Sequence, residues 1–140
     1  LQPLSAAGAE LARALVAADE TALAALGLTK TKVKALRALA GGFMTGQLTP
    51  EALTPLTDAE ILARLDDLPG VGPWTAHMVM IFGLNRPDVF PVDDFGVKKA
   101  AEALYGSVEK ARELSEAWKP YRTAATWLLW RSRTQTPVQY

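Results

Sequence analysis

The sequence predicts an all-α fold, a helical bundle in a single domain over residues 1–140. Apolar residues recur at steps of three and four along the chain, and no alternating segment of useful length predicts a strand. The 140 residues, 49% hydrophobic and 21% charged, are enough for one domain with a real core. Neither an internal repeat nor an interdomain linker interrupts this pattern.

Each expected helix is bounded by a capping residue, a proline or a glycine. In the first half these helices run from Ser5 to about Val16, from Asp19 to Gly27, from Thr29 or Thr31 to Gly41-Gly42, and onward from Thr49-Pro50. In the second half they begin at the capping box Thr57-Asp58-Ala59-Glu60, at Pro73, at Asp93-Asp94, at Ser107 and after Pro120. The Pro73 helix is expected to end near Leu84, and the Asp93-Asp94 helix at Tyr105-Gly106.

Composition excludes several kinds of site. Without cysteine, the chain has no intrinsic disulfide, thiolate chemistry, zinc cluster or cysteine-held iron–sulfur cluster. No apolar run approaches the ~20 residues that cross a bilayer, and the first residues lack the pattern of a signal peptide. We therefore expect a soluble protein that does not contact a membrane.

Charge is balanced overall but clustered locally. The chain carries 15 basic and 15 acidic residues, which argues against a protein that coats nucleic acid nonspecifically. The basic residues gather in two groups: Lys30, Lys32, Lys34 and Arg37 near one helix start, and Lys119, Arg122, Arg131 and Arg133 in the last stretch. Each group can be a solvated helix face or a set of phosphate contacts, and for any single residue the solvated face is favoured.

A glycine-containing turn joins two of the expected helices, over residues 57–84. In Leu68-Pro69-Gly70-Val71-Gly72-Pro73, the glycines let the backbone approach another molecule closely. Amide N–H groups around Gly70 and Gly72, together with the Thr75 hydroxyl, suit a phosphate oxygen. The alternative is a tight turn between helices with no ligand.

An acidic pair, Asp93-Asp94, follows this hairpin and opens the next helix, within a predicted loop and helix over residues 85–105. Aspartate at a helix start is commonly only a cap. Both roles can coexist, with Asp93 capping the helix while Asp94 stays ionised and faces the hairpin, or with the roles exchanged. A carboxylate beside a sugar can stabilise the charge that develops as a glycosidic bond breaks, and can orient the attacking water.

Three segments in this order resemble the helix-hairpin-helix DNA glycosylases of base excision repair. They are Leu65 to Ala76, Val89 to Asp94, and Trp118-Lys119-Pro120-Tyr121-Arg122-Thr123 through Trp130. Within that superfamily the alkylation-repair branch, of the 3-methyladenine DNA glycosylase II type, is most similar. Residues 17–28 and 34–36 also resemble that branch, so the likeness spans roughly residues 17–133.

The resemblance implies roles for individual residues. Asp94 would be the catalytic carboxylate, with Asp93 its structural neighbour. Phosphate would be held by Gly70, Gly72 and Thr75. In related hairpins a Na⁺ or K⁺ ion sits on backbone carbonyls, here those of Asp66, Leu68 and Val71. No other cofactor is expected.

Aromatic residues bear on the choice of base and on the reaction. Trp130 matches the tryptophan of the family's base pocket, and Trp74 and Phe95 are further candidates for stacking on a cationic alkylated purine. Trp74 also stands where lyase-active relatives carry a Schiff-base lysine, which favours an enzyme without strand cleavage. Trp118 and Trp127 are expected to be core residues. Met78 stands where some relatives have an aromatic ring, and His77 is expected at the surface or facing a phosphate.

The expected function is that of a monofunctional DNA glycosylase that releases alkylated purines such as 3-methyladenine from duplex DNA. The alternative is a helix-hairpin-helix module that binds DNA without catalysis. A monomer is expected, in the bacterial cytoplasm at the nucleoid or otherwise in a nucleus. Residues 1–5 match the family's N-terminal part only faintly, so we expect that part, with its wedge residue, to be lacking and apolar surface to be exposed.

Overall fold

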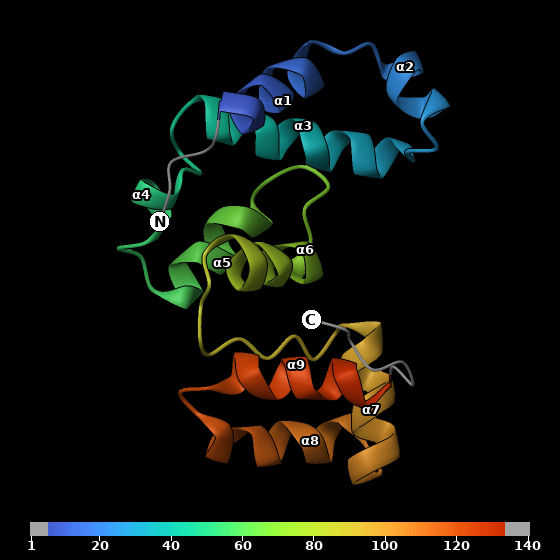
Figure 1. The fold of residues 1–140 in the computed structure, drawn as a ribbon, viewed down its shortest axis with the longest axis vertical. Helices are drawn as coiled ribbons and strands as arrows, with labels where there is room; N and C mark the ends of the chain where they lie inside the picture. Colours follow the sequence, from blue (N-terminus) through green and yellow to red (C-terminus); the bar gives the residue numbers. More distant parts are fainter. Residues whose placement is uncertain (1–5, 134–140) are drawn as a thin grey trace. The chain divides into compact units, whose positions relative to one another are not determined.

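Every regular element in residues 6–133, the range that the computed structural model describes, is a helix (Figure 1). This confirms the all-α prediction. The expected cap at Ser5 lies outside these residues. No helix in the described range is long and apolar enough to cross a membrane.

The chain forms two compact units, residues 1–76 and residues 77–140, and the boundary between them lies inside α6. The first contains α1 (Ala6–Ala17), α2 (Glu20–Ala25), α3 (Lys30–Met44), α4 (Pro50–Leu53), α5 (Asp58–Asp66) and the start of α6 (Pro73–Met78). The second contains a π-helical turn (Val79–Gly83), α7 (Phe95–Tyr105), α8 (Val108–Ser115), a 3₁₀ turn (Glu116–Trp118) and α9 (Arg122–Ser132). That the whole chain is one domain stays a prediction.

Several helices begin at the residues that the sequence predicts, and capping hydrogen bonds stabilise these starts. The Thr57 amide donates to the Glu60 carboxylate at 2.7 Å, and the Glu60 amide donates to the Thr57 hydroxyl at 3.3 Å, which completes the predicted capping box of α5. Thr29, rather than Thr31, caps α3, and Thr49 caps α4. Asp19 occupies the N-cap position of α2 but makes no capping bond through its side chain.

The predicted end of α3 at Gly41-Gly42 is wrong, because the helix continues to Met44. A Cβ atom on Gly42 would lie 2.4 Å from Leu48 Cδ1, and Leu48 is buried. The glycine at position 42 therefore makes room for a core leucine inside the helix instead of ending it.

Each unit has buried apolar residues of its own. In the first unit they include Leu23, Val33, Leu48, Leu53, Ile61 and Leu65. In the second, Val97, Ala100 and Leu129 form a cluster against which Phe90 and Trp130 pack. This cluster joins α7 to α9 and so fixes the two helices that carry the candidate site.

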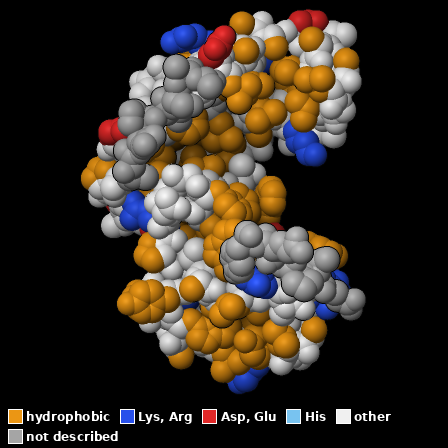
Figure 2. Space-filling view, viewed as in Figure 1, with side chains coloured by type: hydrophobic (Ala, Val, Ile, Leu, Met, Phe, Trp, Pro, Cys, Tyr) orange, Lys and Arg blue, Asp and Glu red, His pale blue; other side chains and the backbone are white. Residues whose placement is uncertain are grey.

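Apolar surface is also exposed, as the sequence led us to expect. In the second unit Leu104, Tyr121 and Leu128 are 56%, 68% and 69% exposed. They line a shallow hollow with Tyr105 and Trp118. Figure 2 shows apolar side chains grouped over the region of α8 and α9.

Candidate active site

The carboxylate of Asp94 is held between two helices. Asp94 is the N-cap residue of α7, and its Oδ1 accepts the Val97 amide at 2.8 Å. The same oxygen accepts the indole N–H of Trp130, on α9, at 2.7 Å. The second unit therefore brings together the predicted catalytic acid and the predicted pocket tryptophan, 36 positions apart.

Asp94, rather than Asp93, caps the helix, whereas which of the two faces the hairpin stays a prediction. Asp93 is exposed and pairs with Lys98 at 3.5 Å. Asp94 is half-buried, and two donors fix the orientation of its carboxylate. Capping therefore accounts for one of the two hydrogen bonds to Asp94 Oδ1, and the Trp130 indole accounts for the other.

Gly96 allows this arrangement, and sequence reasoning missed it. A Cβ atom at this position would lie 3.0 Å from Trp130 Cδ1 and 3.1 Å from Asp94 Oδ1. The indole can reach the carboxylate because the α7 backbone carries no side chain there. The signal in the sequence is a glycine two residues after Asp94, inside a predicted helix.

Trp130 belongs to a group of three aromatic rings. Phe82 stacks on it with ring centroids 5.9 Å apart and planes 6° apart, and Trp127 meets it edge-on at 5.5 Å. Phe82 is 56% exposed and Trp127 46% exposed. The aromatic surface at the site is therefore wider than Trp130 alone, and Phe82 is a second residue that the sequence reasoning missed.

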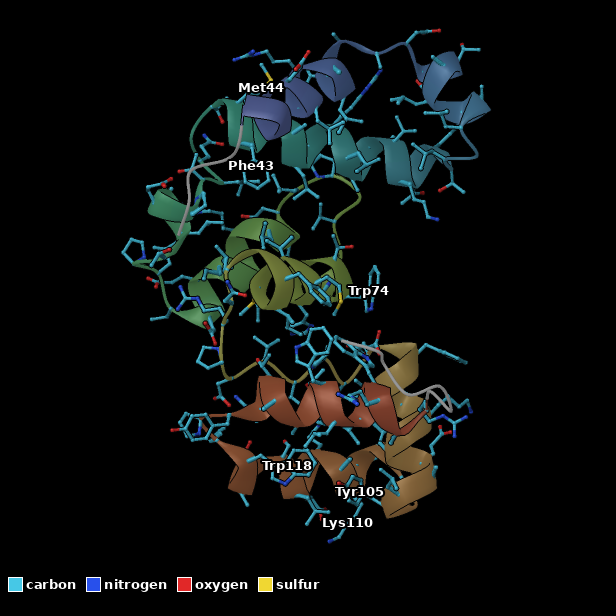
Figure 3. All side chains as sticks on the ribbon, viewed as in Figure 1. Phe43, Met44, Trp74, Tyr105, Lys110 and Trp118 are labelled. Carbon is cyan, nitrogen blue, oxygen red and sulfur yellow. The ribbon has the colours of Figure 1, made fainter. Side chains whose placement is uncertain are left out.

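The assignment of Trp127 to the core is wrong. The buried residues of α9 are Thr126 and Leu129, and Trp127, one residue after Thr126, lies about 100° further round the helix. Trp118 does pack internally, edge-on against Phe90 at 5.6 Å and near Tyr105 at 5.9 Å (Figure 3).

The loop that leads to Asp94 is fastened to the first turn of α9. Arg122 binds both carboxylate oxygens of Asp88, at 2.7 and 2.9 Å. The Val89 amide donates to the Thr123 hydroxyl at 2.9 Å, and the Thr126 hydroxyl donates to the Val89 carbonyl at 3.0 Å. Hydrogen bonds from Arg122 lower the pKa of the Asp88 carboxyl below its ordinary value. Arg122 thus serves this clamp, although its charge alone made it a candidate for phosphate contact.

In the first unit the turn between α5 and α6 lies beside α3 (Figure 1), and Gly70 of this turn packs directly on that helix. Its φ of +79° lies in the left-handed region that favours glycine. A Cβ atom there would lie 2.8 Å from the Thr31 carbonyl oxygen and 3.0 Å from the Ala35 amide nitrogen. This glycine is needed within the protein whether or not a phosphate binds.

Gly72 leaves the backbone open to an approaching molecule. A Cβ atom at this position would meet no atom within 4 Å. The Val71 amide donates to the Leu68 carbonyl at 3.1 Å, whereas within residues 6–133 the amides of Gly70 and Gly72 donate to no acceptor. Two N–H groups on either side of Val71 are therefore available to an anion, with the Thr75 hydroxyl three residues after Gly72.

The remaining candidates lie at the surface or are partly covered. Trp74, near the start of α6, is 51% exposed (Figure 3), and Phe95, the first residue of α7, is 75% exposed. His77 is partly buried rather than at the surface; burial lowers its pKa, and the charge of Asp93 opposes this. Gly70, Gly72, Trp74 and Thr75 belong to the first unit, and Asp94, Phe95 and Trp130 to the second, so their meeting at one cleft stays a prediction.

Comparison with known proteins identifies the family. Residues 5–122 match the family described as HhH-GPD superfamily base excision DNA repair protein. The chain belongs to this superfamily.

Its relatives carry names from alkylation repair. DNA-3-methyladenine glycosylase 1 of Schizosaccharomyces pombe is 32% identical over 120 residues, which are 81% of this chain and 53% of that protein. A putative DNA-3-methyladenine glycosylase of Bacillus subtilis is 35% identical over 92 residues, 62% of this chain and 32% of that protein. The structure resembles that of the S. pombe 3-methyladenine DNA glycosylase in complex with abasic DNA, with a TM-score of 0.79 and 30% identity over 91% of this chain and 66% of that one. The chain thus spans about half the length of the first of these relatives.

Proposed function

We propose that the protein is a DNA glycosylase that flips alkylated purines such as 3-methyladenine out of duplex DNA and hydrolyses their N-glycosidic bonds. The observation that carries the proposal is the Asp94 carboxylate, held by the Val97 amide and the Trp130 indole. A carboxylate with fixed orientation beside an exposed aromatic surface is what such a reaction requires.

The chemistry follows from charge. A purine alkylated at N3 or N7 is cationic and leaves the sugar as a neutral base, while positive charge develops on the sugar. The Asp94 carboxylate stabilises that charge and orients a water molecule, which adds to the sugar carbon and passes its surplus proton to the surrounding water. The aromatic group of Phe82, Trp127 and Trp130 offers electron-rich ring surface to the cationic base.

In this proposal the hairpin holds the DNA strand. The free amides of Gly70 and Gly72 donate to a phosphate oxygen, with Thr75 adding a hydroxyl contact. The abasic DNA bound to the S. pombe relative supports DNA as the partner. A Na⁺ or K⁺ ion on the carbonyls of Asp66, Leu68 and Val71 fits by ligand type, since carbonyl oxygens suit hard cations, although the Leu68 carbonyl already accepts the Val71 amide at 3.1 Å.

We further propose that the enzyme does not cleave the strand. Trp74 stands where lyase-active relatives have a lysine, and an indole cannot form a Schiff base. The two relatives described above are both named DNA-3-methyladenine glycosylases, and these names accord with a monofunctional enzyme.

The test compares Asp94→Asn with Asp93→Asn. Both remove one charge from adjacent positions, but only Asp94 contacts Trp130. Incubation with duplex DNA carrying a methylated purine, followed by alkali, measures base release. We expect Asp94→Asn to lose at least about 100-fold in rate and Asp93→Asn to change a few-fold at most.

Other outcomes would overturn parts of the proposal. Equal release by Asp94→Asn and the unmodified protein would remove Asp94 from the mechanism. DNA binding without release by any of the three proteins would favour the non-catalytic DNA-binding module. Strand breaks before alkali treatment would contradict the absence of lyase activity.

A further inference from the structure

The contact between the hairpin and α3 places a lysine beside the proposed phosphate site. The position that a Cβ atom on Gly70 would take lies 3.4 Å from the Cβ atom of Lys34. The side chain of Lys34 therefore begins directly next to the turn that contains the Gly70 and Gly72 amides. Both elements belong to the first unit, so this proximity is internal to it.

Lys34 is available for an external anion. Its side chain is exposed, and within residues 6–133 no carboxylate lies within ion-pair distance of it. Four other lysines in the described range, Lys98, Lys99, Lys110 and Lys119, each pair with a carboxylate between 2.7 and 3.5 Å away, whereas Lys30 and Lys32 have no such pair within that range. An unpaired ammonium on a flexible four-carbon stem suits a phosphate oxygen.

The geometry of α3 separates Lys34 from its neighbour Lys32. At about 3.6 residues per turn, residues two apart lie on nearly opposite sides of a helix. Gly70 of the hairpin packs against Thr31, Lys34 and Ala35, and Lys32 is not among its nearest neighbours. Lys30, one turn before Lys34, is also exposed and extends the same side of the helix.

We propose that Lys34 binds a DNA phosphate next to the one held by the hairpin amides, so that α3 and the hairpin together form a two-phosphate grip on one strand. The inference rests on the proposed function, because it takes the hairpin to be the DNA-binding element. Lys34 positions the strand without reading its sequence, since phosphate contacts carry no base information.

A phosphate contact has a measurable signature in the salt dependence of binding. Each neutralised phosphate contributes about −0.9 to the slope of log K against log salt concentration for duplex DNA. Lys34→Gln should therefore flatten this slope by about 0.9. Across a fourfold rise in salt, its affinity deficit relative to the unmodified protein should shrink about 3.5-fold.

The experiment measures binding of the whole chain to duplex DNA containing a stable abasic-site analogue, by fluorescence anisotropy over a range of salt concentrations. Lys32→Gln is the matched control, because it removes the same charge from the other side of the same helix. Lys34→Arg should keep the slope, since it keeps the charge. Circular dichroism melting of each variant checks that the fold is intact.

The outcomes separate the two proposals. A flatter slope in Lys34→Gln, with Lys32→Gln unchanged, supports the grip. An unchanged slope in Lys34→Gln, or equal flattening in both variants, overturns it while the glycosylase proposal stands if the protein binds DNA and releases base. No DNA binding by the unmodified protein would overturn both.

Discussion

Replacing Trp130 with phenylalanine would test whether the indole N–H sets the position of the Asp94 carboxylate. The substitution keeps an aromatic ring against Phe82 but removes the donor that lies 2.7 Å from Asp94 Oδ1. Asp94 would keep the Val97 amide but lose one of the two donors that orient its carboxylate.

The size of the effect follows from the kind of bond lost. Hydrogen bonds to charged groups contribute about 1.5–3 kcal/mol, and the half-buried setting of Trp130 places this one near the lower end. We expect the free energy of unfolding to fall by about 1–2 kcal/mol. If the same interaction is needed in the transition state, a loss of about 1.4 kcal/mol lowers the rate of base release about tenfold.

Trp127→Phe is the control for Trp130→Phe. Trp127 lies on the same helix and also contacts Phe82, but it is 46% exposed, and its indole N–H has no acceptor within residues 6–133. The assays are urea unfolding, the Kd for duplex DNA, and single-turnover base release, which reports the chemical step. Only Trp130→Phe should slow release, with Kd unchanged. Equal losses in both variants, or full activity in Trp130→Phe, would refute the positioning role of the bond.

Two further predictions concern the loop clamp and the glycine beneath the indole. Arg122 lowers the pKa of Asp88 in the folded protein, so the ionised Asp88 stabilises the fold. This contribution to the free energy of unfolding is present above the unfolded pKa of about 4 and is lost as pH falls through the folded pKa. The deficit of Asp88→Asn in unfolding free energy should thus be largest above about pH 5 and shrink in acid, which urea titrations at several pH values would measure; a constant deficit would argue against this linkage. Gly96→Ala gains up to about 1 kcal/mol of helix propensity, but its Cβ crowds Trp130 and Asp94, at a cost of about 1–3 kcal/mol. Thermal melting should therefore show it destabilised, whereas Gly41→Ala, where a Cβ meets nothing within 4 Å, should be stabilised; the reverse order would contradict the contact geometry.

Much of the fold was predictable because residues close in sequence determine where a helix begins and ends. The capping box at Thr57, the cap at Ser107 and the glycine that ends α7 act over three or four positions, so their effect can be read from the chain directly. The same locality explains the error at Gly42. Its role depends on a contact with Leu48, which only the packed structure supplies.

By itself the sequence determined the all-α class, the order of the helices, and the hairpin and acidic pair on which the resemblance to the superfamily rests, because these depend on local patterns and ordered motifs. Only the tertiary structure decided that Trp130 binds Asp94, that Gly96 makes room for this bond, that Arg122 clamps the loop, and that Lys34 lies beside the hairpin. These contacts join residues 34 to 36 positions apart or lie between separate helices. Such pairs form through packing, which the periodicity of one segment does not encode.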